Sequence, residues 1–113
     1  MDEIRPEAFN QVLHSAPRIT IMSRLAIHRS IRFDALQKST TLTAGILAAH
    51  LRVLEESGYV TLESLPNSVS RQRAVKITPR GDEEFRSHVG QMMRLFGTFQ
   101  GPGSAARSPT SKK

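Results

Sequence analysis

The apolar residues between positions 42 and 60 repeat with the period of an α-helix. Three leucines at i, i+4 and i+7 would form its buried stripe: Leu47, Leu51 and Leu54. Thr43 can cap the start of this helix, because its hydroxyl accepts a hydrogen bond from a free amide in the first turn. Gly58 can end the helix, because glycine readily adopts the left-handed backbone conformation. The pattern therefore predicts a helix over residues 43–57, followed by a strand.

A second long apolar repeat follows Thr78 and Pro79, a pair that suits the cap and the first turn of a helix. It predicts a helix that ends at residue 96, with one stripe of four apolar residues: Phe85, Val89, Met92 and Phe96. Three shorter helices are predicted earlier in the chain: residues 6–13, residues 15–28, and residues 35–39 with Asp34 as the cap.

Two other segments show the period of two that is typical of β-strands. Apolar residues alternate with polar ones on either side of turn-forming residues: Val60, Leu62, Val75 and Ile77. This pattern predicts a β-hairpin with a polar, basic tip over residues 63–73. A very short strand is predicted at residues 31–33. Together the elements predict a mainly α-helical chain with a small β-hairpin, an α+β fold.

The formal net charge of +6 favours a polyanionic partner such as nucleic acid. Three of the basic residues lie in the last part of the chain, which holds no acidic residue: Arg107, Lys112 and Lys113. This part is also rich in Gly, Pro and Ser, a composition that buries little apolar surface. We therefore predict a folded domain over residues 1–96 and a disordered basic tail over residues 97–113.

The sequence offers little catalytic or metal-binding chemistry. It has no cysteine, which excludes disulfides and thiolate metal sites, and its four histidines are too scattered to indicate a metal cluster. His50, at the edge of the leucine stripe, is typical of a packed, hydrogen-bonded helix residue rather than a ligand. No glycine-rich phosphate loop, nucleophile–base motif, signal pattern or long apolar run is present. We expect a cytoplasmic protein that is not an enzyme, has no cofactor or metal, and makes no membrane contact.

Two spaced motifs lie in the predicted structural context of a known family. The first is LT-x-G-x-L-x-x-H-L-x-x-LE-x-x-GYV, from Leu42 to Val60, and the second is Ile77-Thr78-Pro79-Arg80-Gly81 at the start of the last helix. In these motifs, over roughly residues 14–96, the chain resembles the winged helix-turn-helix regulators of the MarR and ArsR type, most of all a group of small one-domain members. The resemblance implies a winged helix-turn-helix fold and binding to double-stranded DNA.

The predicted helix over residues 43–57 is the candidate recognition helix, because its outer face is small enough to enter the major groove. Its candidate DNA contacts are Thr43, Ala44, Gly45, Ile46, Ala48, Ala49 and Arg52. The predicted hairpin tip adds Arg71 and Arg73 for the DNA backbone or the minor groove. Further cations suit either phosphate contact or simple surface charge: Arg18, Arg29, Arg32 and Lys38.

The resemblance also implies a homodimer, in which the first and last helices form the interface. It would involve six apolar residues: Phe9, Val12, Phe85, Val89, Met92 and Phe96. A two-fold dimer would present two recognition helices to two half-sites about one helical turn apart.

The outer face of the candidate recognition helix also leaves alternatives open. Ile46, Ala48 and Ala49 stand where relatives often carry Asn and Ser, and they can touch thymine methyl groups but cannot make bidentate hydrogen bonds to bases. DNA shape and the wing would then contribute more to recognition. One alternative is a winged helix that serves as a protein-interaction adaptor. Another is an effector-gated regulator, whose ligand pocket would have to lie at the dimer cleft.

Overall fold

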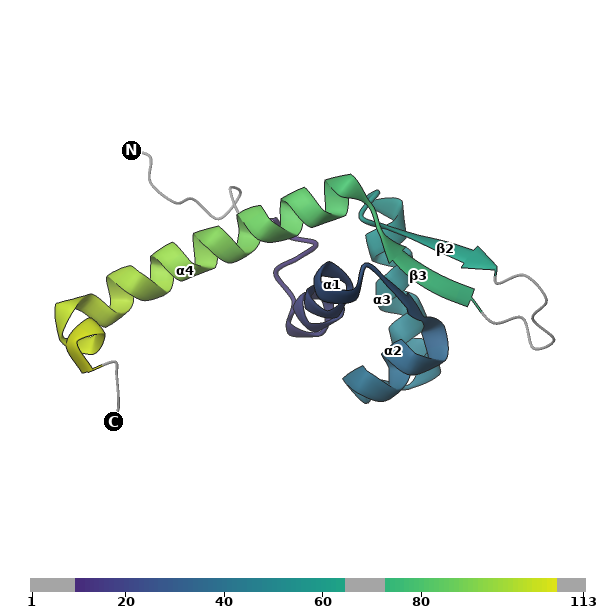
Figure 1. The fold of residues 1–113 in the computed structure, drawn as a ribbon, viewed down its shortest axis with the longest axis horizontal. Coiled ribbons are helices and arrows are strands. Elements are labelled where there is room, and N and C mark those ends of the chain that lie inside the picture. Colours follow the sequence, from purple (N-terminus) through teal and green to yellow (C-terminus); the bar gives the residue numbers. More distant parts are fainter. Residues whose placement is uncertain (1–9, 65–72, 108–113) are drawn as a thin grey trace.

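The computed structural model describes residues 10–64 and 73–107, and side chains as far as residue 97. In chain order its elements are α1 (Ala16–His28), β1 (Ser30–Arg32), α2 (Phe33–Thr40), α3 (Ala44–Glu56), β2 (Val60–Ser64), β3 (Arg73–Ile77) and α4 (Pro79–Arg107). Helices α1, α2 and α3 cluster together, the β2–β3 hairpin projects from this body at one end, and α4 extends from it at the other (Figure 1). Among the described residues, no helix combines the length and the hydrophobicity that a membrane span requires. The α+β winged-helix fold predicted from the sequence is confirmed.

The predicted start and end of α3 are confirmed, and α1 begins with a cap of the same kind. The Thr43 hydroxyl accepts a hydrogen bond from the Ile46 amide at 3.1 Å, and Gly58 has a φ of 82°, in the left-handed region. Ser15 caps α1 in the same way, by accepting from the Arg18 amide at 3.5 Å. These caps satisfy amides that the helix itself leaves without partners.

Helix α2 begins earlier than predicted. Its cap position is Arg32, Phe33 is its first residue rather than a strand residue, and Asp34 lies inside the first turn. The Asp34 carboxylate accepts a hydrogen bond from the adjacent Ala35 amide at 2.8 Å instead of capping the helix. A carboxylate is favourable anywhere in a first turn, so the sequence signal located the turn but not the cap position.

Both ends of the chain also differ from the prediction. Of the helix predicted over residues 6–13, the described part is a turn at residues 11–13, and residues 1–9 lie outside the described residues. Helix α4 continues past residue 96 to Arg107, and Figure 1 shows it bending near its end. A helix that has already formed gains one hydrogen bond for each added residue, so it tolerates poor helix formers at its end.

The short strand β1 joins the hairpin as a third strand. The sheet is antiparallel in the order β1-β3-β2, and Val75 of β3 pairs with Ile31 on one side and Leu62 on the other. The predicted two-stranded wing is therefore anchored through β3 to the segment between α1 and α2.

One hydrophobic core joins the helices to the sheet. It contains the three predicted leucines of α3 and apolar residues from the other elements: Leu13, Ile21, Met22, Leu25, Leu36, Leu47, Leu51, Leu54, Tyr59, Val60, Val75, Ile77 and Phe85. Because all three α3 leucines are buried, the opposite face of α3 is turned away from the core.

The two sequence motifs meet at one junction. The Thr78 hydroxyl donates to the Gly58 carbonyl at 2.6 Å and accepts from the Gly81 amide at 2.9 Å, while the Thr78 amide donates to the Tyr59 carbonyl at 3.0 Å. The Arg80 guanidinium lies over the Tyr59 ring, 5.8 Å from its centroid. The start of α4 is thus fixed to the end of α3.

Arg18 and Arg29 serve the fold. Arg18 donates from Nε to His50 Nδ1 at 3.2 Å and from its guanidinium to the Val12 carbonyl at 3.0 Å. Arg29 forms an ion pair with Asp82 at 3.3 Å and so links the end of α1 to the start of α4. The prediction that His50 is a hydrogen-bonded helix residue is confirmed. Burial, together with the charge of Arg18, lowers the pKa of His50.

His14 and His88, which are far apart in sequence, lie together where α4 passes the segment before α1. Their rings pack edge to face with centroids 5.8 Å apart, and His88 is only 1% exposed. Burial is the main cause that lowers the pKa of His88, and the nearby His14 lowers it further.

Because His88 is buried, we expect the stability of the fold to be sensitive to acid between about pH 7 and pH 5. Because the pKa of His88 is lower in the folded chain, the unfolded chain binds a proton that the folded chain rejects. The free energy of unfolding should be maximal above the unfolded histidine pKa of about 6.5 and should fall as the pH drops below it, by at most about 1.4 kcal/mol per pH unit for this one group. His88→Gln should make the decline shallower in urea unfolding series over this range. An equal slope in both proteins would contradict the prediction.

Candidate nucleic-acid interface

The outer face of α3 is exposed as the leucine stripe predicts. All seven candidate residues are exposed to solvent: Thr43, Ala44, Gly45, Ile46, Ala48, Ala49 and Arg52. A Cβ added at Gly45 would meet no atom within 4 Å, so the fold itself does not require glycine there. The surface is therefore a shallow, uncharged strip with one cation, Arg52, toward its C-terminal side.

The start of α3 provides backbone donors. The Thr43 hydroxyl accepts a hydrogen bond from the Ile46 amide, and the Leu47 amide donates to the Thr43 carbonyl at 2.9 Å. The amides of Ala44 and Gly45 make no hydrogen bond with another described residue. Free amides and the positive end of the helix dipole favour an anion at this position.

Acidic side chains restrict the usable length of the strip. Glu55 and Glu56 are exposed in the last turn of α3, and Glu63 is exposed on β2 just beyond it. Carboxylates repel phosphates, so a polyanion would approach the N-terminal part of α3 rather than its end.

The basic candidates lie on the elements that flank α3. Lys38 is exposed on α2, and Arg73 is exposed at the base of the wing, where it pairs with Ser64. Arg32 is also exposed but lies 3.5 Å from the Asp34 carboxylate, which partly neutralises it. Arg71 lies outside the described residues. Arg18 and Arg29 already have partners within the fold, as described above.

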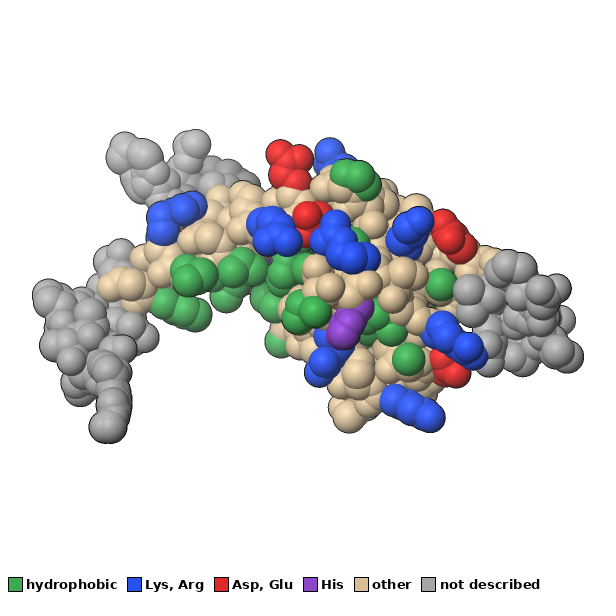
Figure 2. Space-filling model, viewed as in Figure 1, with side chains coloured by type: hydrophobic (Ala, Val, Ile, Leu, Met, Phe, Trp, Pro, Cys, Tyr) green, Lys and Arg blue, Asp and Glu red, His purple; other side chains and the backbone are tan. Residues whose placement is uncertain are grey.

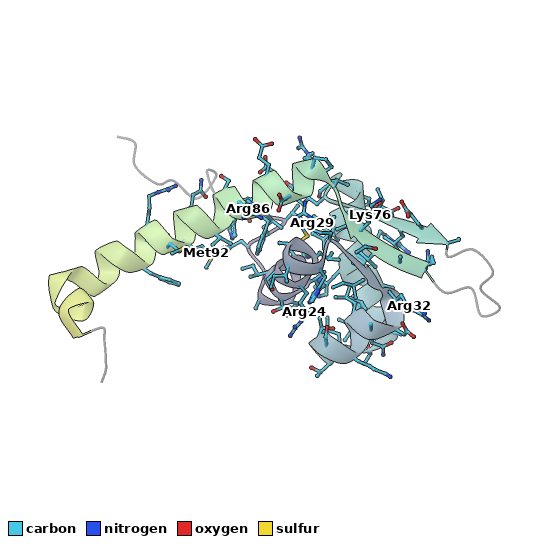
Figure 3. The ribbon with its side chains drawn as sticks, viewed as in Figure 1. Arg24, Arg29, Arg32, Lys76, Arg86 and Met92 are labelled. Atoms are coloured by element: carbon cyan, nitrogen blue, oxygen red, sulfur yellow. The ribbon has the colours of Figure 1, made fainter. Side chains whose placement is uncertain are left out.

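The predicted dimer residues occupy different environments. Phe85 is part of the core, Val12 and Val89 pack against the core, Met92 is half-buried, and Phe9 lies outside the described residues. Phe96 is 56% exposed, next to two exposed apolar residues that the sequence reading did not select, Met93 and Leu95. Figure 2 shows hydrophobic side chains gathered along one side of α4, and Figure 3 labels Met92 on this part of the helix. Met93 and Leu95 could have been predicted from the sequence by allowing the apolar stripe of this helix to be wider than one residue per turn.

Comparisons with known proteins agree with this geometry. A family model described as "Winged helix DNA-binding domain" matches residues 18–96. An uncharacterized protein of Methanocaldococcus jannaschii is 27% identical over 85 residues, which are 75% of this chain and 92% of the relative.

Two solved structures share the fold. A transcriptional regulator homologue from Pyrococcus horikoshii OT3 superposes with a TM-score of 0.76 and 29% identity, over 80% of this chain and 89% of that one. A mutant of MarR from E. coli, solved in complex with operator DNA, gives a TM-score of 0.59 and 25% identity, over 73% of this chain and 59% of that one. With the family model covering most of the described residues, this chain belongs to the winged helix DNA-binding domain family and resembles the MarR-type transcription regulators.

Proposed function

We propose that this protein is a transcription regulator that binds double-stranded DNA as a homodimer. The N-terminal part of α3 would enter the major groove, and the wing would lie along the neighbouring backbone or in the minor groove. The observation that carries the proposal is the outer face of α3. Its small side chains, Arg52 and the N-terminal amides of Ala44 and Gly45 are exposed, and Lys38 of α2 and Arg73 of the wing add exposed positive charge.

Fluorescence anisotropy with a labelled random-sequence duplex tests this proposal directly. Binding should be micromolar or tighter at low salt and should collapse as salt is raised, because each phosphate contact releases condensed counterions. Failure to bind at low salt would contradict the proposal.

Two arginines should contribute to DNA binding in different ways. The Arg52 and Arg73 side chains are both exposed, so alanine at either position should leave folding intact. Arg52→Ala should weaken binding to an operator selected from a random library by about 1–3 kcal/mol and relax its sequence preference. Arg73→Ala should weaken binding to all duplexes alike and reduce the salt slope by about 1. The Arg71→Ala/Arg73→Ala double variant should reduce the salt slope by roughly 2.

Thermal melts of both variants provide the folding control for this comparison. Unchanged affinity in Arg52→Ala and in the Arg71→Ala/Arg73→Ala double variant would contradict the proposed docking mode.

We also propose that residues 97–113 act as a basic tail added to the DNA-binding domain of residues 1–96. Ending the chain at residue 96 removes Arg107, Lys112 and Lys113 and should lower affinity for random duplex, while leaving the free energy of unfolding nearly unchanged. Chemical unfolding of the full and shortened chains gives the measurement. A large loss of stability would show that the tail belongs to the folded domain.

A protein-interaction adaptor is a second candidate function, which the 49% exposure of Ile46 in the middle of the α3 strip favours. An apolar protein contact would be nearly independent of salt, whereas DNA binding would not. The salt series above therefore separates the two candidates.

A further inference from the structure

The exposed surface on the first turns of α3 is apolar. Between positions 44 and 49 only Leu47 is buried, and the exposed residues are Ala44, Gly45, Ile46, Ala48 and Ala49, none with a polar side chain. The polar side chains at either end of this stretch have partners within the fold: the Thr43 hydroxyl accepts from the Ile46 amide, and His50 Nδ1 accepts from Arg18. Side chains in this stretch can therefore recognise a base only through apolar contact.

Ile46 is the largest side chain of this surface. It is the third residue of α3, and 49% of it is exposed to solvent. Ala49 lies three residues further on, so the two side chains are neighbours on the helix surface. In helix-turn-helix proteins the N-terminal residues of the recognition helix contact base edges. Ile46 and Ala49 occupy such positions in α3.

Gly45 allows another molecule to approach the helix closely. A Cβ at this position would meet no atom of the described residues within 4 Å, and Gly45 lies within the regular helix α3. Glycine in a helix lowers stability relative to alanine, because it loses more conformational freedom on folding. Neither packing nor backbone conformation therefore requires glycine here. A glycine at such a position is typical of close approach between a backbone and its ligand.

The major groove offers one apolar group to this surface. All four bases present hydrogen-bond donors or acceptors there, and thymine adds a methyl group at C5. Cytosine that is methylated at C5 presents a methyl group at the same place. An apolar side chain can therefore select bases through this group.

We propose that Ile46, with Ala49 beside it, recognises C5-methyl groups in the major groove. Each half-site would present thymine or 5-methylcytosine to the start of α3, and Gly45 would let the helix come close enough for contact. This inference rests on the proposed function, because it names the feature of duplex DNA that the α3 surface selects. Contacts from basic side chains to phosphates add affinity but do not depend on these methyl groups.

Base analogues test the contact with the full-length protein in anisotropy titrations. In an operator selected from a random library, each thymine is replaced in turn by uracil, which keeps the hydrogen-bonding groups and removes the methyl group. Affinity should fall about fourfold for each methyl group that is buried against the protein. A second pair of duplexes carries cytosine or 5-methylcytosine at the sensitive positions. The methylated duplex should bind more tightly by the same factor, so the two series distinguish the two sources of the methyl group.

Three substitutions assign the contact to the protein. Ile46→Ala should bring the ratio of thymine-duplex to uracil-duplex affinity toward one. Ile27→Ala makes the same change at an isoleucine of α1 that is 73% exposed, and it should leave the affinities and their ratio unchanged. Gly45→Ala should raise the melting temperature but weaken operator binding, because its methyl group occupies space that the groove needs. Thermal melts of all three variants verify folding.

A random-sequence duplex in the same titrations separates the two ways of failing. Binding to it at low salt, with equal affinity for the thymine and uracil operators, would overturn methyl recognition and leave the proposed function intact. A thymine preference that persists in Ile46→Ala would also overturn the inference. So would a uracil effect without a 5-methylcytosine effect, because DNA shape would then account for it. Failure to bind any duplex would overturn both the inference and the proposed function.

Discussion

Replacing Gly81 by alanine is expected to lower the free energy of unfolding by about 3 kcal/mol or more. A Cβ at this position would lie 2.9 Å from the Tyr59 Cα and carbonyl carbon, and closer still to the Tyr59 carbonyl oxygen. Backbone atoms cannot rotate away as a flexible side chain does, so the start of α4 would have to separate from Tyr59. That movement would strain the Thr78 hydrogen bonds to Gly58 and Tyr59. The melting temperature should fall by roughly 10–25 °C, because each kcal/mol corresponds to several degrees in a domain of this size.

Gly90→Ala is the matched control in the same helix. An added Cβ at Gly90 would meet only the Arg94 side chain, at an ordinary contact distance of 3.7 Å. Alanine is the better helix former, so this variant should gain roughly 0.5–1 kcal/mol. If the close approach at Gly81 is real, thermal and urea unfolding should show a lower free energy of unfolding for Gly81→Ala and a higher one for Gly90→Ala than for the wild type. Equal stabilities would show that the junction can adjust around a methyl group.

The Gly81 contact could not be predicted from the sequence, although the helix signals around it could. Thr78 and Pro79 predicted the start of α4, and Gly58 predicted the end of α3, because caps and stops are local signals. That these signals occupy one junction is a property of the folded chain, produced by the return of the β2–β3 hairpin. The same limit applies to Arg29 with Asp82 and to the two histidines His14 and His88. Each pair depends on how α4 packs against α1 and the segment before it.

The candidate DNA surface was more accessible to sequence reasoning than the surroundings of Arg24, whose Nε is buried without a hydrogen-bond partner among the described residues. The leucine stripe determines which side of α3 is buried, so the exposed strip from Thr43 to Arg52 follows from helical periodicity alone. Arg24 carries no comparable signal, because in the sequence it is one basic residue in a predicted amphipathic helix. It becomes distinctive only when β1 and α2 fold against α1 and enclose its Nε.

Phe96→Glu is expected to convert the proposed dimer to a monomer and to weaken binding to a two-half-site operator by about 100-fold or more. Phe96 is 56% exposed and Met93 is 66% exposed, on a part of α4 that extends beyond the other helices (Figure 1). Exposed apolar residues adjoining a half-buried stripe favour a partner surface, and in a two-fold dimer the same patch meets its own copy. A glutamate there would bury a charge without a partner in both copies at once.

Ser87→Glu is the matched control, because it places the same charge on an exposed position of the same helix. Sedimentation velocity should show a dimer of the 12.6 kDa chain for the wild type and for Ser87→Glu, and a monomer for Phe96→Glu. Phe96→Glu should lose more operator affinity than Ser87→Glu. In a monomer, binding at one half-site no longer raises the effective concentration of a second chain at the other half-site. Phe96→Glu should still unfold cooperatively, with a melting temperature below that of Ser87→Glu only by the contribution of the lost dimer, if the α4 patch contributes to assembly and not to the core. A wild-type monomer would require that DNA be bound by single chains, each reading one half-site with α3 and its wing. An unchanged dimer in Phe96→Glu would show that the dimer interface lies away from the α4 patch.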